Sequence, residues 1–214
     1  NSSLMTLLQS GLAKSLAEPY TIDNSLRFND GDSAYLKRTC DSAASSSTAW
    51  TYSGWVKLSK VPGGAALFMG GDNVNDYSIV SFNTNGQIKA KSHTDPSTTS
   101  YDIETTSVYR DPGAWYHVFV AYDSTQAETD RIKIYVNGDR VTALDNTSYP
   151  SASLAEPYIN VNTEDQWISK WGSNDTGYYD GYMAEVYVID GTASFDDFGE
   201  LDSTTNQWIP LDSD

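Results

Sequence analysis

The sequence predicts an all-β fold in which two antiparallel sheets pack face to face, as a sandwich or jelly roll. Three observations support this prediction. About a dozen short segments rich in Val, Ile, Tyr and Trp follow one another, with turn residues between them. Some of these segments alternate strictly between apolar and polar residues, the period of a strand with one buried face. Helical spacing is confined to the first twenty residues.

The N-terminal residues differ from the rest of the chain. Five leucines recur close to helical spacing, and Pro19 ends the pattern. We therefore expect a short amphipathic helix over residues 3–17, within a docking segment of residues 1–24. A leucine stripe on one short helix needs a surface to cover it, supplied either by the following domain or by a partner. The leucines are Leu4, Leu7, Leu8, Leu12 and Leu16.

The main domain is expected over residues 25–195, as strands joined by turns. Arg131–Val136 alternates strictly, which places its three branched apolar residues on one face. Asn137-Gly138 supplies the backbone that a type I′ hairpin needs, and Asn85-Gly86 predicts a second hairpin of this kind. The predicted strands are Ser25–Phe28, Ala34–Lys37, Ala49–Leu58, Ala65–Met69, Tyr77–Phe82, Gln87–Lys91, Trp115–Asp123, Arg131–Val136, Arg140–Ala143, Gln166–Lys170 and Tyr182–Ile189.

Two features lie outside this strand pattern. Residues 196–214 are expected to form an acidic C-terminal tail. The hexapeptide Ser15–Tyr20 recurs without change as Ser153–Tyr158. The residues around the two copies do not align, so a domain duplication is not indicated. A shared local turn before an edge strand is one interpretation, and chance is the other.

Composition excludes several classes of function. The 214 residues include 13 Lys and Arg against 29 Asp and Glu, a formal charge of −16, so nucleic acid is not an expected partner. No apolar run is long enough to span a bilayer, so membrane insertion is not expected. Cys40 is the single cysteine, which excludes an intrachain disulfide and a cysteine zinc cluster. His93 and His117 are far apart in sequence, which argues against a histidine-rich metal site.

Four segments, in order along the chain, resemble the strands of concanavalin A-like, laminin-G-type jelly rolls. Such families carry a W-x-x-x-G-W-V strand, a W-x-H-V strand, a Y-V-N-G hairpin and a closing D-G-x-x-x-E-V strand. The resemblance covers about residues 25–195 and implies a two-sheet antiparallel jelly roll of that type. The matching segments are Trp50–Lys57, Trp115–Asp123, Ile134–Gly138 and Tyr179–Tyr187.

A second resemblance is to structural proteins of marine bacteriophages, such as tail-fibre and capsid-surface proteins. It implies a place on the extracellular surface of a virion, with other virion proteins as partners and an oligomeric state. The segments that carry it are Ser25–Asp30, Ser33–Leu36, Tyr109–His117, Ile189–Ala193, Phe198–Ser203 and Gln207–Pro210.

Enzyme signatures are incomplete in this sequence. Retaining glycoside hydrolysis needs paired carboxylates on one side of a strand, as in an E-x-D-x-x-E run. Glu128-Thr-Asp130 begins such a run, but Lys133 occupies its third position. A Ser–His–Asp triad would have to use His93 or His117, and His117 lies mid-strand among apolar residues, which favours a structural imidazole. We therefore expect a protein that is not an enzyme.

Calcium is the ion that the composition favours, because it takes carboxylate, amide and carbonyl oxygens from loops. Laminin-G-like domains often bind calcium at one rim, with an acidic residue before a central strand and another after the hairpin. The resemblance assigns these positions to Asp76 and to Asp145 or Asn146. The alternative is that all three are ordinary turn formers.

One aromatic loop has the composition of a glycan site. Aromatic faces stack on sugar rings, and Asn and Asp side chains bind hydroxyl groups. Within Lys170–Asp180 the candidate contacts are Trp171, Asn174, Tyr178 and Tyr179. Core packing or a protein interface would use the same residue types.

Together these observations predict a non-enzymatic virion structural protein that attaches to host-surface glycans. Its jelly roll would be displayed on the particle through the N-terminal helix and the C-terminal tail. One alternative is a purely structural capsid decoration or tail assembly protein without glycan binding. A glycoside hydrolase is the remaining alternative.

Overall fold

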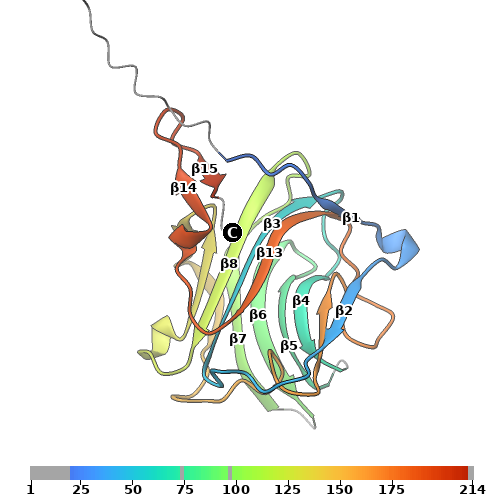
Figure 1. The fold of residues 1–214 in the computed structure, drawn as a ribbon, viewed down its shortest axis with the longest axis vertical. Helices are drawn as coiled ribbons and strands as arrows, with labels where there is room; N and C mark the ends of the chain where they lie inside the picture. The colour runs from blue at the N-terminus through green and yellow to red at the C-terminus, as the bar shows by residue number, and fades with distance from the viewer. Residues whose placement is uncertain (1–19, 73–74, 96–97, 212–214) are drawn as a thin grey trace, which may run out of the picture.

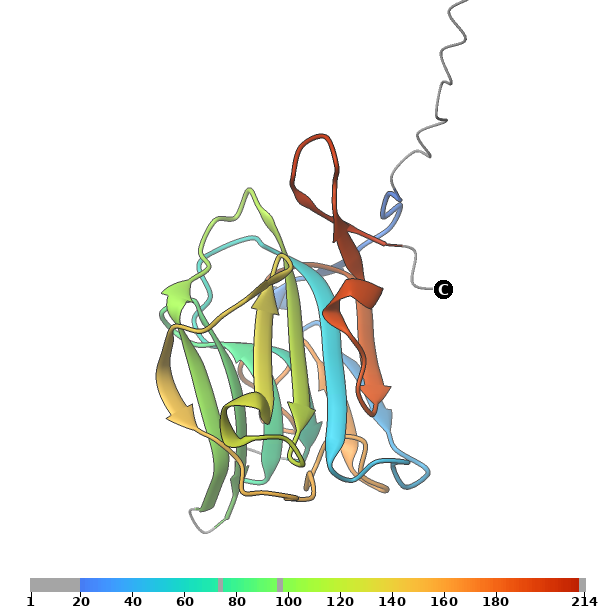
Figure 2. The ribbon, with the colours of Figure 1, turned by 90° about the vertical axis from the view of Figure 1, so that its left-hand side faces the viewer.

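The computed structural model describes residues 20–72, 75–95 and 98–211, and its two large sheets confirm the predicted all-β sandwich. The sheets lie face to face, and paired strands run antiparallel (Figures 1 and 2). The first sheet has six strands in the order β1-β13-β3-β8-β9-β10. These are β1 (Leu26–Phe28), β13 (Gly181–Asp190), β3 (Ala49–Leu58), β8 (Trp115–Asp123), β9 (Ile132–Val136) and β10 (Asp139–Arg140).

The second sheet has seven strands in the order β11-β7-β6-β5-β4-β12-β2. They are β11 (Leu144–Ser148), β7 (Thr98–Val108), β6 (Gln87–Thr94), β5 (Tyr77–Phe82), β4 (Ala65–Gly71), β12 (Asp165–Ile168) and β2 (Leu36–Thr39). A separate hairpin pairs β14 (Gly199–Leu201) with β15 (Trp208–Pro210). Helical structure in the described ranges is limited to the 3-10 turns η1 (Asp30–Asp32), η2 (Glu128–Asp130) and η3 (Phe195–Asp197).

Strand alternation builds the core between the two sheets. In β3, Trp50 and Tyr52 point inward and are at most 1% exposed. Trp50 stacks on Tyr122 of the neighbouring β8 with ring centroids 5.8 Å apart. Tyr122 in turn meets Tyr101 of the opposite sheet at 5.5 Å. Aromatic side chains therefore span the interior from one sheet to the other.

A buried carboxylate ties a long connection to both sheets. Glu156 is 6% exposed and accepts hydrogen bonds from Trp50 Nε1 at 3.0 Å and Tyr101 Oη at 2.9 Å, one from each sheet. The hydroxyl of Ser78 and the backbone N–H of Tyr158 also donate to it. Burial raises the pKa of Glu156. Glu156 belongs to the second copy of the repeated hexapeptide, while the first copy, apart from its last residue, lies outside the described residues.

The two predicted hairpins both form, but with different turns. Asn137 and Gly138 have φ values of 51° and 82°, so the predicted type I′ turn is confirmed. At the other hairpin only Gly86 has a positive φ, 79°, and its N–H donates to the carbonyl of Asn83 at 3.0 Å. That turn starts at Asn83, one residue earlier than predicted, and the type I′ assignment at Asn85-Gly86 was wrong.

Two further differences from the expected strands occur. Strand β7 spans eleven residues that the sequence analysis left unassigned, and β11 was also missed. The predicted strand 140–143 keeps only its first residue, because β10 ends at Arg140. The predicted helix over 3–17 lies outside the described residues.

Candidate functional site

The C-terminal residues pack against the outer face of the six-stranded sheet. Along these strands every second side chain points outward, and several of these outward side chains are aromatic. The C-terminal segment covers them. Phe195 of η3 stacks on Tyr135 of β9 with ring centroids 4.5 Å apart. Phe198 contacts Phe119 of β8 at 5.9 Å and Tyr187 of β13 at 5.5 Å. The segment expected as an acidic tail thus begins as a packed part of the sandwich.

Trp208 of β15 fastens the hairpin to this face. A methyl group built on Gly199 would lie 2.5 Å from Cε2 of the Trp208 ring, and one built on Gly138 would lie 2.3 Å from Cε3. Both glycines are therefore needed for the ring to approach so closely. The Trp208 Nε1–H donates to His117 Nδ1 at 3.0 Å, and the two rings stack at 6.0 Å.

His117 is held in one tautomer by this contact. Because an indole N–H can only donate, Nδ1 of His117 accepts and the ring proton is on Nε2. Nε2 lies 2.8 Å from Ser53 Oγ and therefore donates to it. Burial lowers the pKa of His117 to about 4. A general base would have to accept the hydroxyl proton of Ser53, and this tautomer cannot.

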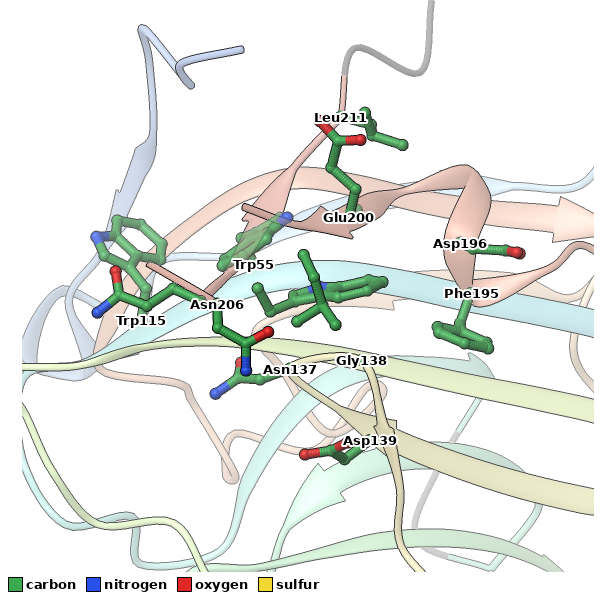
Figure 3. Close-up of a pocket in the computed structure, with 14 residues that line it drawn as sticks. Trp55, Trp115, Asn137, Gly138, Asp139, Phe195, Asp196, Glu200, Asn206 and Leu211 are labelled. Carbon is green, nitrogen blue, oxygen red and sulfur yellow. The ribbon is translucent and has the colours of Figure 1, made fainter. Parts of the chain in front are cut away.

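Between the hairpin and the sheet lies a cleft of about 1060 Å³, which we call the hairpin cleft (Figure 3). Its walls come from β3, β8, the β9–β10 turn, η3 and the β14–β15 hairpin. Four lining side chains are aromatic, three are amides and three are carboxylates, and none of the described lining residues is Lys or Arg. They are Trp55, Trp115, Phe195, Trp208; Asn137, Asn206, Gln207; Asp139, Asp196 and Glu200.

Two of the tryptophans have properties suited to a ligand. Trp115 is 36% exposed, so part of its ring is open to solvent. Trp55 is 7% exposed, and its buried Nε1 has no hydrogen-bond partner within the described part of the chain. A buried donor without a partner costs about 1–3 kcal/mol, and because Trp55 Nε1 is covered by protein atoms, Trp115 is the more accessible of the two rings to a ligand.

The loop predicted to contact a glycan lies on the other side of the sandwich. Trp171 packs edge-on against Tyr77 of β5, with ring centroids 5.4 Å apart, on the outer face of the seven-stranded sheet. Trp171 Nε1 and Asn174 Nδ2 are both buried without a partner among the residues described. Tyr179 is fully buried in the main core. Its ring is therefore a core element with no face open to a ligand.

Tyr178 takes part in an aromatic cage that the chain fills itself. The ammonium group of Lys170, a residue only 8% exposed, lies 4.4 Å from the ring centre of Tyr35 and 5.5 Å from that of Tyr178. Trp167 completes the cage at 5.4 Å. These contacts are cation–π interactions. They give Lys170 and Tyr178 a packing role in this loop.

The residues predicted to bind calcium do not converge. Asp76 lies beside the start of β5 and accepts from Asp95 N at 3.1 Å. Asp145 of β11 accepts from Gln87 Nε2 at the other end of β6. Because Tyr77 pairs with His93, six residues along β6 from Gln87, about 20 Å separates the two carboxylates. Asp145 and its neighbour Asn146 therefore cannot share one ion with Asp76.

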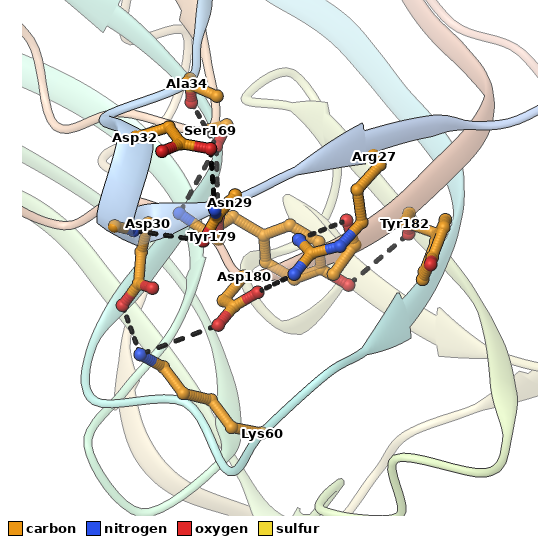
Figure 4. A network of polar contacts seen from close by, with 12 residues as sticks. Arg27, Asn29, Asp30, Asp32, Ala34, Lys60, Ser169, Tyr179, Asp180 and Tyr182 are labelled. Carbon is orange, nitrogen blue, oxygen red and sulfur yellow. Dashed lines mark hydrogen bonds and ion pairs between the residues drawn. The ribbon is translucent and has the colours of Figure 1, made fainter.

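The described residues contain no group of three or more His, Cys, Asp and Glu side chains that could hold a metal ion. At one rim of the sandwich, carboxylates are already paired with cations of the chain (Figure 4). Asp180 is 2.6 Å from Arg27 and 3.7 Å from Lys60, and Lys60 also contacts Asp30. These pairs connect β1 to the β3–β4 connection and to β13.

A family profile decides the assignment of the fold. The profile of the Laminin_G_3 family, described as the concanavalin A-like lectin/glucanases superfamily, matches residues 30–197. The chain belongs to this superfamily. A search of curated proteins found no match to this concanavalin A-like chain. Within the described residues, no helix has the length and apolar character needed to cross a membrane.

Solved structures similar to this concanavalin A-like chain come from diverse proteins. Domain 4 of AbnA, an extracellular arabinanase from Geobacillus stearothermophilus in complex with arabinotriose, has a TM-score of 0.56 and 14% identity, over 78% of this chain and 70% of that domain. Tailspike protein 2 of Escherichia coli O157:H7 bacteriophage CAB120 has a TM-score of 0.54 and 17% identity, over 81% of this chain and 23% of the tailspike. At these identities the likeness concerns the fold alone.

The hairpin cleft was missed because its residues come from distant parts of the sequence. One signal was present. Trp55, Phe119 and Tyr135 occupy outward-facing strand positions, where a solvent-exposed sheet would carry polar residues. Such a row of aromatic residues indicates that another segment of the chain, or a partner, covers that face.

Proposed function

We propose that this chain is a non-enzymatic carbohydrate-binding module whose ligand lies in the hairpin cleft. The observation that carries the proposal is the combination, in one cleft, of tryptophan rings with amide and carboxylate side chains. Aromatic faces pack against the C–H groups of a sugar ring, and amides and carboxylates bind its hydroxyls. The jelly-roll fold of the concanavalin A-like superfamily is compatible with this role.

The charge of the cleft selects the class of glycan. Asp139, Asp196 and Glu200 line it without a neighbouring Lys or Arg in its described lining, and the whole chain carries a formal charge of −16. A sialylated or uronic glycan would bring a carboxylate into this negative potential. The proposed ligand is therefore a neutral or amino-containing glycan.

The proposed role is binding without hydrolysis. The Ser53–His117 pair lies beneath Trp208 with its proton on the wrong nitrogen for base catalysis. Glu128 and Asp130, the carboxylates nearest to a hydrolase pattern, lie on η2 and are absent from the cleft lining. Asp130 instead pairs with Arg140 at 2.7 Å.

We place this binding role on the surface of a virion, in several copies, where it would attach the particle to host-surface glycans. The sequence resemblance to marine bacteriophage structural proteins motivates this assignment. The alternative is a decoration or tail assembly protein that contacts other virion proteins alone, in which case the exposed aromatic residues would serve an interface.

A glycan array followed by calorimetry with the best neutral glycan tests the proposal. We expect Trp115→Ala to lower affinity about tenfold, because it removes one stacking face. Trp171→Ala, in the loop on the other sheet, and Tyr182→Ala, a 39%-exposed aromatic outside the cleft, should leave affinity unchanged. EDTA should also leave it unchanged, since the predicted calcium ligands do not converge.

Each other outcome would contradict one part of the proposal. If Trp171→Ala lost binding while Trp115→Ala kept it, the site would lie on the opposite sheet. Binding to acidic glycans alone would overturn the charge argument. Release of new reducing ends from a bound glycan would overturn the non-enzymatic role, and binding to no glycan at all would favour the assembly protein.

A further inference from the structure

An apolar groove runs between the edge strands of the two sheets on one side of the sandwich. Strands β1 and β2 are edges of different sheets, and they lie on the same side of the molecule (Figure 1). The groove, about 470 Å³, is lined by Leu26 of β1, Leu36 of β2 and Met183 of β13, among others. Leu26 is 56% exposed and Leu36 is 47% exposed. Isolated exposed leucines are ordinary, but exposed apolar side chains that gather beside one groove mark an interaction surface.

The N-terminal residues 1–19, which precede the described structure, join it beside this groove. Nineteen residues precede Tyr20, the first one described. The Tyr20 hydroxyl donates to Glu185 Oε1 at 3.1 Å, and both Glu185 and Asn24 belong to the groove lining. Residues 1–19 therefore join the described chain at the rim of the groove, only a few residues away from it.

The composition of that segment complements the groove. It carries the stripe of five leucines, and its two charged residues, Lys14 and Glu18, cancel. A neutral segment avoids the repulsion that most other parts of this acidic chain would meet at the surface. As a helix, residues 3–17 would be about 22 Å long, and no more than about 14 Å of extended chain separates Tyr20 from Asn24.

We propose that residues 3–17 form an amphipathic helix that packs its leucine stripe into the β1–β2 groove of the same chain. The short tether gives this segment a high effective concentration at its own groove, which favours it over a second copy. Leu26 and Leu36 then become contacts buried beneath the leucine stripe.

Hydrogen–deuterium exchange on the full chain, with light scattering to measure mass, tests this. In Leu8→Ser/Leu12→Ser we expect about tenfold faster exchange in β1 and β2 at unchanged mass. Leu36→Ser should likewise speed exchange within residues 3–17. The matched control is Ala13→Ser/Ala17→Ser, which introduces serines on the opposite face of the helix. It should change exchange neither in β1 and β2 nor within residues 3–17.

Two results would overturn the proposal. A drop from dimer to monomer mass in Leu8→Ser/Leu12→Ser would show that the stripe fills the groove of a second copy. Unchanged exchange in β1 and β2, with residues 3–17 unprotected in the parent chain, would show that the groove is not covered by this segment. A near-native circular dichroism spectrum checks that each variant is folded.

Discussion

His117 shows how one contact decides the chemistry of a residue. Its ring is 1% exposed, stacked on Trp55 at 5.1 Å and hydrogen-bonded through both nitrogens. Protonation would place a second N–H against the Nε1–H of Trp208, and it would bury a charge with no carboxylate as its hydrogen-bond partner. The neutral form is therefore the form that supports the packed hairpin.

This predicts a loss of stability in mild acid. The pKa of His117 is about 4 in the fold, against 6.5 for the free side chain, so the unfolded chain binds more protons as pH falls below 6.5. The linkage amounts to about 2 kcal/mol lost between pH 8 and pH 5. Denaturant unfolding at pH 8, 7, 6 and 5 measures it. His117→Asn, which offers Trp208 an amide acceptor, should flatten the profile in this window.

Carboxylates with a lowered pKa act below this window, whereas Glu156, whose pKa burial raises, favours the folded state as pH falls and so opposes the effect of His117. Asp123 and Asp190 accept backbone hydrogen bonds that lower their pKa below the usual value of 3.8, so stability linked to them is lost only as pH falls below about 5. Because Glu156 is present in both proteins, the difference between the two pH profiles reports on His117 alone, and a His117→Asn variant with the same pH profile as the parent would contradict the assignment.

At this scale the sequence predicted some roles and missed others. The mid-strand position of His117 indicated a structural imidazole, and its burial agrees with that. Its partner Trp208 is 91 residues away, and no local pattern links the two. Tyr178 and Tyr179 were assigned together to a ligand surface. Only Tyr178 retains partial exposure, because Tyr179 turns into the core.

At the scale of elements, the β14–β15 hairpin depends on close contact between backbone and ring. Gly199 has an ordinary φ, so the effect of a side chain there is steric and involves no backbone strain. Its neighbour is the indole of Trp208, which is confined between two glycines and the His117 ring. The hairpin therefore has little room to adjust.

Gly199→Ala should loosen this hairpin. The added methyl group would meet the Trp208 ring at 2.5 Å, and overpacking of this kind costs about 1–3 kcal/mol. We expect a matching drop in unfolding free energy and a red shift of tryptophan fluorescence as Trp208 moves toward solvent. Gly63→Ala is the matched control, because a methyl group there meets nothing within 4 Å.

A stable Gly199→Ala variant with an unchanged fluorescence maximum would show that the indole can move without cost. If the proposed function is correct, the variant also binds the neutral glycan more weakly, since Trp208 lines the cleft. Binding is measured at a temperature where the variant is fully folded, so that weaker binding reports a change at the cleft and not a loss of folded protein.

Elements with regular apolar alternation were predictable, and polar ones were not. Arg131–Val136 contains three branched residues at every second position, and β9 forms there. The eleven residues of β7 contain six Thr and Ser outside its Tyr101 and Ile103 pair, so composition indicated a loop. Its place between β6 and β11 supplies the hydrogen bonds that local propensity did not indicate.

At the scale of the whole molecule, the order of the strand motifs along the sequence predicted the sandwich. The cleft could be recognised only in the three-dimensional structure. Four strand signatures in the right order indicated a laminin-G-like jelly roll, and the family profile agrees. The cleft unites Trp55, Trp115, Asn137 and Trp208, which are separated by up to 153 positions in the sequence. Only the register of β3 with β8 and the return of the C-terminal hairpin bring them together.

Net charge leads to a prediction for the molecule as a whole. Eight of the 13 basic residues already form ion pairs in the described chain, yet the chain carries 16 more acidic than basic residues. Exposed pairs contribute about 0–1 kcal/mol each, so salt has little attraction to weaken. The excess carboxylates repel one another, and salt screens that repulsion.

Raising NaCl from about 0.02 M to about 0.5 M should therefore stabilise the fold, because the Debye length shrinks to about 4 Å. If screening of the repulsion raises the free energy of unfolding by about 1–2 kcal/mol, the melting temperature should rise by several degrees for a chain of this size. Calorimetry at pH 7.5 measures it, and choline chloride should act like NaCl because the effect is screening and not binding of one cation. Near pH 4.2, where the net charge vanishes, the increase should disappear. A melting temperature that falls with salt at pH 7.5 would mean that the ion pairs outweigh the repulsion of the excess carboxylates.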